Sequence, residues 1–272
     1  MKRFFPLFLW LAFAIVAITL WLALDNLFYL FNFLYIGTAV SVGVGLFIRG
    51  NRYARIGVQL AVGVYMLVYL GIFERENMQI EGFWYYLFSG TFQAAVIHYL
   101  VAKIAGPFLF GRGWCGYACL TAMVLDFLPF KVPHAPRKKR LGAIRYVLFA
   151  LSLTFVALLF MLRVQNLEQI MWVAFLVGNA LYYALGITLA FALRDNRAFC
   201  KYICPVAVFL KPASFFAMLR VKVDETKCIS CGKCERVCPM NVSLREPSRT
   251  RKNGTECILC YECSKVCPKK AI

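Results

Sequence analysis

The chain has 272 residues, of which 61% are hydrophobic, and its mean hydropathy is +0.67. A soluble globular domain is about half apolar, so this composition excludes an ordinary soluble protein. Long apolar runs fill the sequence up to about Phe216, whereas the sequence from Leu219 onward is polar, basic and rich in cysteine. We therefore expect two domains, residues 1–218 in the membrane and residues 219–272 outside it.

Six apolar stretches are long enough to cross a hydrocarbon core, which takes about 20 helical residues. They are Leu7–Ala23, Leu27–Ile48, Ile56–Phe73, Phe83–Ile104, Ile144–Leu162 and Ile170–Leu193. The first stretch resembles a signal peptide, but it has no small-residue cleavage site and the second stretch follows almost at once. The expected fold class is an all-α polytopic membrane bundle of about six transmembrane helices.

The formal net charge of +18 fits either nucleic-acid binding or the cytoplasmic loops of a membrane protein. With the N-terminus inside, the short inner segments carry thirteen Lys and Arg residues, and the outer segments carry two. The outer segments are instead acidic, with Asp25, Glu74, Glu76, Glu81 and Glu168. The positive-inside rule explains this charge, so we expect lipid and no nucleic acid as a partner. Both termini and the tail are predicted on the cytoplasmic side of the inner membrane.

The tail contains two cysteine runs of the form C-x2-C-x2-C-x3-C-P, at residues 228–239 and 257–268. This is the ligand run of bacterial ferredoxins, in which the fourth cysteine of each run binds the neighbouring cluster. Zinc sites and disulfide frameworks explain the repeated run poorly. We therefore predict a ferredoxin domain with two [4Fe–4S] clusters, which transfers single electrons. Cluster 1 is assigned to Cys228, Cys231, Cys234 and Cys267, and cluster 2 to Cys257, Cys260, Cys263 and Cys238.

Four further cysteines form two pairs, Cys115 with Cys119 and Cys200 with Cys204. Each pair follows the inner end of a predicted span, and a spacing of four residues places both thiols on one face of a helical turn. Isolated buried cysteines behave as small hydrophobic residues, but two matching pairs at one membrane boundary favour a function. The four thiols are predicted to hold a third metal centre of the Fe–S type, with redox-active dithiols as the alternative.

With these motifs the chain resembles the NapH family of ferredoxin-type membrane proteins, which are related to the membrane parts of NosR and CcoG. Residues 200–205 match the C-x3-C-P motif of that family, and residues 115–119 match it up to Leu120, where the family has proline. The resemblance covers residues 106–272. It implies oxidation of a membrane quinol and transfer of electrons to other redox subunits of a membrane complex. NosR-like proteins carry an outer flavin domain, for which the chain has no room, so no flavin is expected.

Only two histidines exist, His98 in the fourth predicted span and His134 in an inner loop, so we expect no bis-His haem. An ionisable residue in a span is a functional candidate, and the pKa of histidine is easily tuned near neutrality. His98 is therefore the candidate acceptor of quinol protons, with Gln93 as a second polar partner. The alternative roles are an accessory protein that supplies electrons for maturing a metalloenzyme, and a transporter. The transporter lacks intramembrane charges and is disfavoured.

Overall fold

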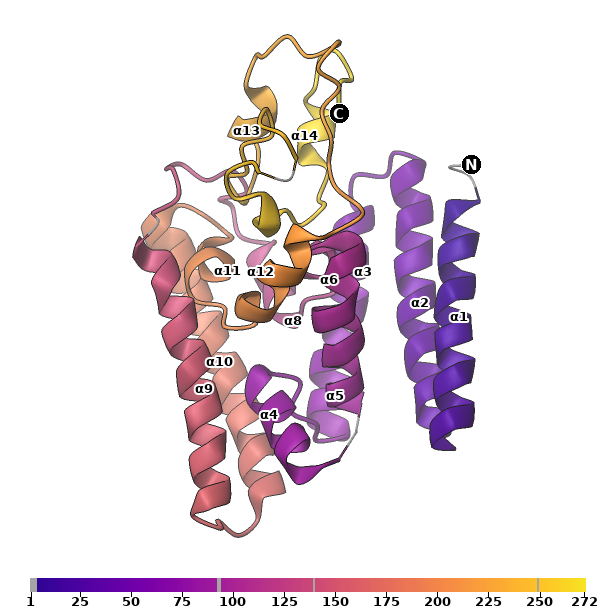
Figure 1. Ribbon diagram of the computed structural model, residues 1–272, viewed down its shortest axis with the longest axis vertical. Coiled ribbons are helices and arrows are strands. Elements are labelled where there is room, and N and C mark those ends of the chain that lie inside the picture. The colour runs from indigo at the N-terminus through magenta and orange to yellow at the C-terminus, as the bar shows by residue number, and fades with distance from the viewer. Residues whose placement is uncertain (1–3, 92–93, 139, 249) are drawn as a thin grey trace.

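The computed structural model describes residues 4–91, 94–138, 140–248 and 250–272, and these residues contain helices but no strand. Long helices run side by side, and a small irregular lobe caps one end of them (Figure 1). The start of helix α1 lies at the same end as this lobe, as the expected topology requires. The predicted fold class, a helical bundle with a C-terminal ferredoxin lobe, is confirmed.

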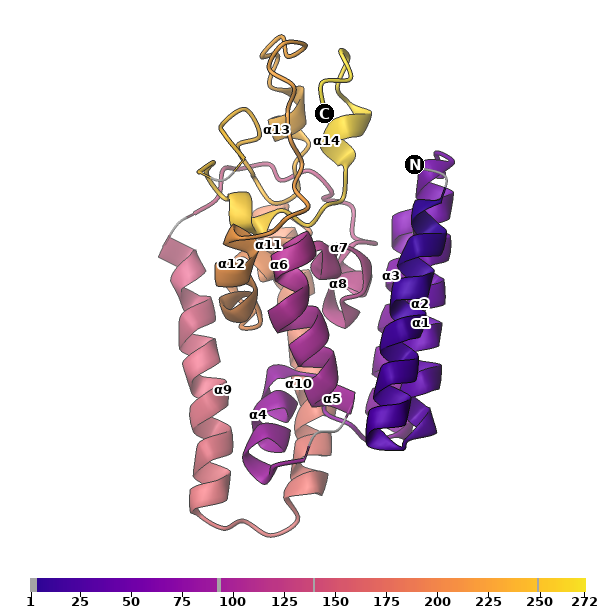
Figure 2. The ribbon, with the colours of Figure 1, turned by 45° about the vertical axis from the view of Figure 1, so that its right-hand side comes forward.

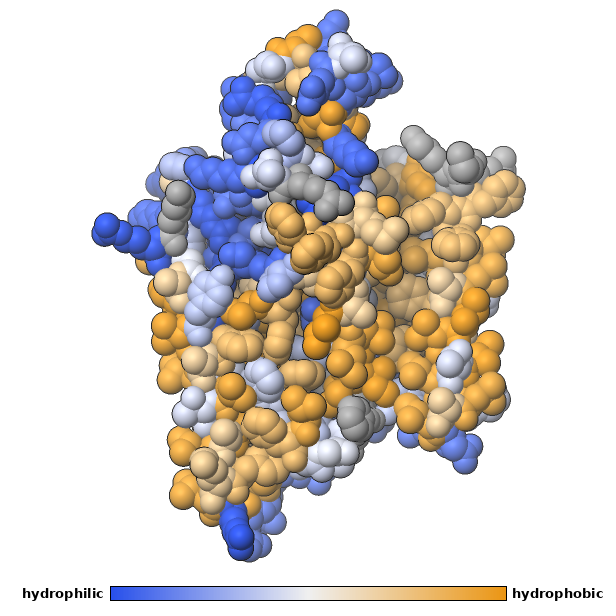
Figure 3. All heavy atoms as spheres, viewed as in Figure 1, coloured by the Kyte–Doolittle hydropathy of each residue, from blue (hydrophilic) through white to orange (hydrophobic). Residues whose placement is uncertain are grey.

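Within the described residues, five helical segments are long and apolar enough to span a membrane. They are α1 (Phe5–Leu24), α2 (Leu27–Ile48), α3 (Ala54–Val64) continued by the π-helical η1 (Tyr65–Phe73), α9 (Ile144–Met161) preceded by the 3-10 turn η3 (Arg140–Ala143), and α10 (Leu167–Leu193). Apolar side chains cover the surface along these helices, and hydrophilic ones cover the lobe (Figure 3). The protein is therefore a membrane protein, with its apolar flanks facing lipid.

The fourth predicted span, Phe83–Ile104, is wrong, because the chain turns in the middle of it. Helix α4 (Ile80–Ser89) ends at Gly90, whose φ of +69° places it in the left-handed region that glycine adopts freely. A second helix then returns through α5 (Ala94–His98), η2 (Tyr99–Ala105) and α6 (Gly106–Phe110). Hydropathy averaging joined two apolar helices across this turn, because Gly90 and its neighbours are too few to lower the mean.

The segment before α4 re-enters the bundle. Helix η1 continues from Met66 to Phe73, and the chain then comes back. Met78, just before α4, lines the same cavity as Met66. Asn77 holds the returning loop, since its amide donates to the Met171 carbonyl at 2.9 Å and its Oδ1 accepts from the Gln79 N–H at 2.9 Å. Non-helical backbone at membrane depth is tolerated only where such partners satisfy its polar groups.

Short helices form the layer between the bundle and the lobe. These are α7 (Gly113–Tyr117), α8 (Leu120–Leu125), α11 (Ala198–Tyr202) and α12 (Ala207–Phe215). Turning the molecule shows α7 and α8 beside α6, and α11 and α12 near the end of α10, all directly beneath the lobe (Figure 2). The lobe itself contains α13 (Lys233–Arg236), η4 (Gly254–Glu256) and α14 (Glu262–Lys265). Both predicted C-x3-C motifs therefore lie at the junction of the two parts.

Candidate functional site

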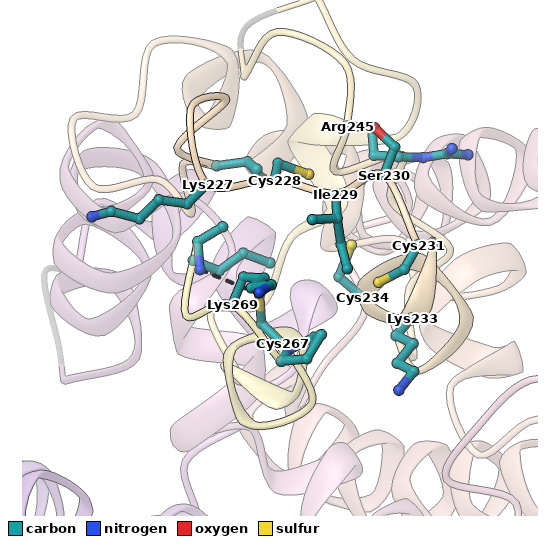
Figure 4. A pocket seen from close by; sticks show the side chains of 15 residues that line it. Lys227, Cys228, Ile229, Ser230, Cys231, Lys233, Cys234, Arg245, Cys267 and Lys269 are labelled. Atoms are coloured by element: carbon teal, nitrogen blue, oxygen red, sulfur yellow. Dashed lines mark hydrogen bonds between the residues drawn. The ribbon is translucent and has the colours of Figure 1, made fainter.

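One cavity in the lobe is surrounded by the cysteines assigned to cluster 1. Cys228, Cys231, Cys234 and Cys267 all line it, although Cys267 is far from the others in sequence (Figure 4). Lys227 and Lys233 point outward from the same pocket, so the surface around it is basic. The structure thus brings together the four side chains that the ferredoxin spacing groups, and the set fits a [4Fe–4S] cluster.

The second set of lobe cysteines also converges. Cys238 interacts electrostatically with Cys257, Cys260 and Cys263, which shows that the crossed fourth cysteine lies beside the other run. Burial raises the pKa of both the Cys260 and Cys263 thiols to about 12. Without a metal these thiols would therefore be protonated at neutral pH, whereas iron binds the thiolate form.

The two ferredoxin cysteine runs share the same backbone conformation, with two left-handed residues each. Ser230 and Gly232 in the first run have φ values of 52° and 71°, and Leu259 and Tyr261 in the second have 52° and 58°. Left-handed residues at alternate positions curl the chain tightly, so that successive cysteines face one point. Three of these four are not glycine, and such strained positions cluster at functional sites.

The two C-x3-C motifs share one local structure, which differs from the prediction. Cys115 and Cys200 each lie in a five-residue helix, α7 or α11, but Cys119 and Cys204 lie beyond the ends of these helices. The expected single helical turn is therefore wrong for both pairs. Ala118 leaves the helical region with φ −144°, and Pro205 cannot continue α11. Each second cysteine is thereby turned back toward the first.

All four of these cysteines line one cavity at the junction, together with Lys103 and Arg112. No three of the described His, Cys, Asp and Glu side chains converge on a point that one metal ion would occupy. Four cysteine side chains around one cavity are the ligand set that a [4Fe–4S] cluster uses.

Two arginines cross-link the motifs in a reciprocal way. Arg112 and Arg197 stand at the start of α7 and α11, each three residues before the first cysteine of its motif. Arg112 donates to the Cys200 carbonyl at 3.4 Å, and Arg197 donates to the Cys115 carbonyl at 3.0 Å. Arg197 Nη1 also lies 3.8 Å from the Cys200 sulfur. The two halves of the site are thus tied together by positive charges.

The charges around the cavity act unequally on its thiols. Burial raises the pKa of Cys115, but the positive charges of Arg112 and Lys103 outweigh burial, so the net pKa lies below its ordinary value. Burial raises the pKa of Cys200 to about 12 despite Arg197. Electrostatic interactions connect Cys200 with the other three cysteines of the cavity. The thiols therefore behave as one coupled set.

The junction site contacts the cluster 2 run directly. A Cβ on Gly116 would come within 2.3 Å of the Ile258 carbonyl oxygen, so only glycine permits this approach of two backbones. The Tyr117 hydroxyl donates to the Leu259 carbonyl at 2.9 Å. Both contacts join residues between the paired cysteines of the two sites. The cluster 2 run is thus next to the junction, and its Cys260 and Cys263 are buried, whereas Cys231 of the cluster 1 set is exposed.

Glu256, directly before Cys257, anchors this contact. Its carboxylate pairs with Arg112, with Arg137 at 2.9 Å and with Arg145 at 3.0 Å, and only 2% of the side chain is exposed. Arg112 and Arg145 are fully buried. Neither this acid nor Arg197 was predicted from the sequence. For the arginines a signal exists, since an R-x2-C-x3-C pattern occurs twice, at residues 112–119 and 197–204.

The predicted proton acceptor His98 is buried against Trp114, the residue directly before Cys115. Its side chain is 4% exposed, its ring packs edge-on against Trp114 at 5.0 Å, and Nε2 has no hydrogen-bond partner among the described residues. Neither His98 nor Trp114 is among the residues that line the cavity. Gln93 lies outside the described residues. Asp126 forms ion pairs with Arg55 and Arg197 at 2.6 Å each.

Comparison with protein families matches both sets of cysteines. Residues 220–268 match the 4Fe–4S dicluster domain, and two segments, 94–128 and 177–221, match a 4Fe–4S binding domain. The lobe is therefore a ferredoxin-type domain that carries two [4Fe–4S] clusters. Each segment of the second match contains one C-x3-C motif and the helix before it. The two matches overlap at residues 220–221, next to the predicted domain boundary at 218.

Three curated relatives extend this likeness. Two are uncharacterized proteins of Methanocaldococcus jannaschii: MJ0749 is 29% identical over 62% of this chain and 68% of its own length, and MJ0750 is 27% identical over 54% and 66%. The third, the putative electron transport protein YccM of Escherichia coli, is 26% identical over 25% of this chain and 19% of its own length. No solved structure matches the chain. The chain is thus an iron–sulfur electron-transfer protein of the membrane.

Proposed function

We propose that the protein oxidises membrane quinol and passes single electrons through three iron–sulfur centres to a partner oxidoreductase, as a NapH-like subunit. The observation that carries this proposal is the junction cavity, in which both C-x3-C motifs meet beside the cluster 2 run. The match of these motifs to a 4Fe–4S binding domain supports a third [4Fe–4S] centre held by Cys115, Cys119, Cys200 and Cys204.

The order of the centres follows from the contacts. The junction cavity is lined by residues of the bundle, and the cluster 2 run contacts α7 through Ile258 and Leu259. The cluster 1 set is closer to solvent, since its Cys231 is exposed whereas Cys260 and Cys263 of cluster 2 are buried. Electrons from a lipid-soluble donor would enter at the junction and leave at cluster 1. The basic side chains Lys227, Lys233 and Arg245 around cluster 1 suit an acidic redox partner. We place the lobe on the cytoplasmic side, in accordance with the positive-inside rule.

The test is the iron and acid-labile sulfide content of protein purified without oxygen, with EPR spectra after addition of quinol. We expect roughly twelve irons, since each cubane holds four. Cys115→Ser and Cys204→Ser should remove one EPR signal and leave the two lobe signals. Reduction by quinol supports the dehydrogenase role.

An iron content of about eight per chain, unchanged by Cys115→Ser, would confine the clusters to the lobe. The four junction thiols would then be a dithiol or structural site, and the third centre would be refuted. If quinol also left all centres oxidised while dithionite reduced them, an accessory role in maturing a metalloenzyme would replace quinol oxidation.

A further inference from the structure

The re-entrant segment carries polar side chains into the apolar bundle and leaves two of them unsatisfied. Asn77 is fully engaged by Met171 and by the Gln79 N–H. Gln79 is 6% exposed, and its Nε2 has no hydrogen-bond partner among the described residues. Glu81 was expected in an outer loop, but it lies in the first turn of α4, and its Oε2 is buried without a partner there. Buried polar groups without partners require an explanation.

Gln79 faces the junction cavity from the side of the bundle. Met78, Gln79 and Ile80 line that cavity together with the four cysteines. A Cβ on Gly178 would come within 2.4 Å of Gln79 Oε1, and Gly178 lies near the middle of the 27-residue helix α10. At 1.5 Å per residue, this position is deep within the span of α10. The free amide group is therefore inside the hydrocarbon layer and next to the proposed centre.

Glu81 is not itself among the residues that line the cavity, but it directly follows Ile80, which does. It interacts electrostatically with Tyr99 and Tyr182, and both tyrosines line the cavity and interact with Cys204. The start of α4, a ten-residue helix, points the positive end of its dipole toward the same place. An ionisable residue inside a membrane marks a substrate or proton pathway by default.

We propose that Gln79 and Glu81 bind the head group of the quinol and that Glu81 accepts its protons, an inference that rests on the proposed function. Both O–H bonds of the quinol break, and its two electrons pass one at a time to the centre at Cys115, Cys119, Cys200 and Cys204. Each proton moves in turn to the Glu81 carboxylate, which releases the first to water before it takes the second. The amide of Gln79 donates a hydrogen bond to the oxygen of the quinone that remains.

The experiment follows reduction of the clusters by absorbance in a stopped-flow instrument, without oxygen, with the full chain in detergent. The donors are decylubiquinol and menadiol, and dithionite serves as a donor that needs no quinol site. The variants are Glu81→Gln and Gln79→Leu. The matched control is Glu168→Gln, which removes an exposed carboxylate from the first turn of α10. Iron content is measured for every variant.

We expect Glu81→Gln to slow quinol reduction about 100-fold, the usual contribution of a general base, with iron content and dithionite reduction unchanged. The rate of the wild-type protein should rise with pH as the carboxylate ionises, and Glu81→Gln should lose this dependence. Gln79→Leu should raise the quinol concentration for half-maximal rate roughly fivefold to tenfold, as expected for one lost hydrogen bond. Because Nε2 has no partner among the described residues, leucine should not impair folding.

Quinol rates at the level of Glu168→Gln in both variants would overturn the inference and leave quinol oxidation standing. If neither quinol reduced the wild-type protein while dithionite did, quinol oxidation and this site would both be wrong. If Glu81→Gln lost iron, Glu81→Asp and Gln79→Leu would decide, because the first keeps the carboxylate and the second changes no charge. In that case an unchanged half-maximal quinol concentration in Gln79→Leu, or a Glu81→Asp protein that keeps its iron but is reduced by quinol no faster than Glu81→Gln, would overturn the inference.

Discussion

Replacing Glu256 by glutamine should undock the ferredoxin lobe from the membrane bundle. The carboxylate is 2% exposed and neutralises charges on Arg112, Arg137 and Arg145, and Lys211 lies 3.8 Å away. Glutamine keeps the shape of the side chain but removes its charge. Removing one partner of a buried ion pair destabilises by about 3–5 kcal/mol, because the other charge stays buried without compensation.

The magnitude should lie in the upper part of that range, since two of the three arginines are fully buried and would repel each other. At 1.4 kcal/mol per factor of ten, about 3–5 kcal/mol shifts the docking equilibrium roughly 10²–10⁴-fold toward the separated lobe. The lobe keeps its own cluster ligands, so its iron content should not fall.

Limited trypsin digestion and the rate of electron transfer into the lobe measure this effect. In Glu256→Gln the connection near residues 211–222 should be cleaved faster, and quinol should reduce the lobe clusters more slowly than dithionite does. Glu225→Gln removes an exposed lobe carboxylate and should behave as the wild type. Equal cleavage rates and equal quinol reduction in the two variants would refute the role of the buried cluster.

Two glycine substitutions test the close backbone contacts. Gly116→Ala places a Cβ 2.3 Å from the Ile258 carbonyl oxygen, so the cluster 2 run must move away. Electron transfer to the lobe should become slower while the iron content stays unchanged. Wild-type kinetics would contradict the importance of this contact. Gly82→Ala places a Cβ 1.8 Å from the Asn77 carbonyl, within the re-entrant turn. It should lower the thermal midpoint by several degrees, as expected for overpacking of about 1–3 kcal/mol. Gly57→Ala, which meets nothing within 4 Å, should leave the midpoint unchanged.

The cysteine spacing predicted more of the molecule than hydropathy did. The ferredoxin runs identified two cluster sites, and the structure brings Cys267 beside Cys228 and Cys238 beside Cys257, as the crossed assignment requires. Ligand spacing is informative because a cubane imposes one geometry on the chain. The helix over residues 27–48 was also predicted at its observed ends, because polar Asn26 and Arg49 flank a continuous apolar run.

The re-entrant segment was missed for a physical reason. A window of about 20 residues averages over both α4 and the helix that follows, and each is apolar because each is buried in the bundle. Only Gly90 and the pair of Asn77 with Gln79 mark the turn and the returning loop. Polar residues like Asn77 and Gln79 are equally common in the outer loops of membrane proteins, so Glu81 was predicted in an outer loop. The residue is partly exposed, and the burial of its Oε2 depends on residues distant in sequence.

The charge balance of the interior supports the same arrangement of centres. Among the described residues, six basic side chains are buried but only three acidic ones. The basic residues are Lys103, Arg112, Arg145, Arg197, Lys201 and Arg251, and the acidic residues are Asp126, Asp195 and Glu256. Lys103 has no carboxylate within 4 Å among the residues described. Buried charges persist only when they are compensated. Four thiolates around a cubane carry net negative charge, so centres at the junction and in cluster 2 would supply the compensation that the acids alone do not.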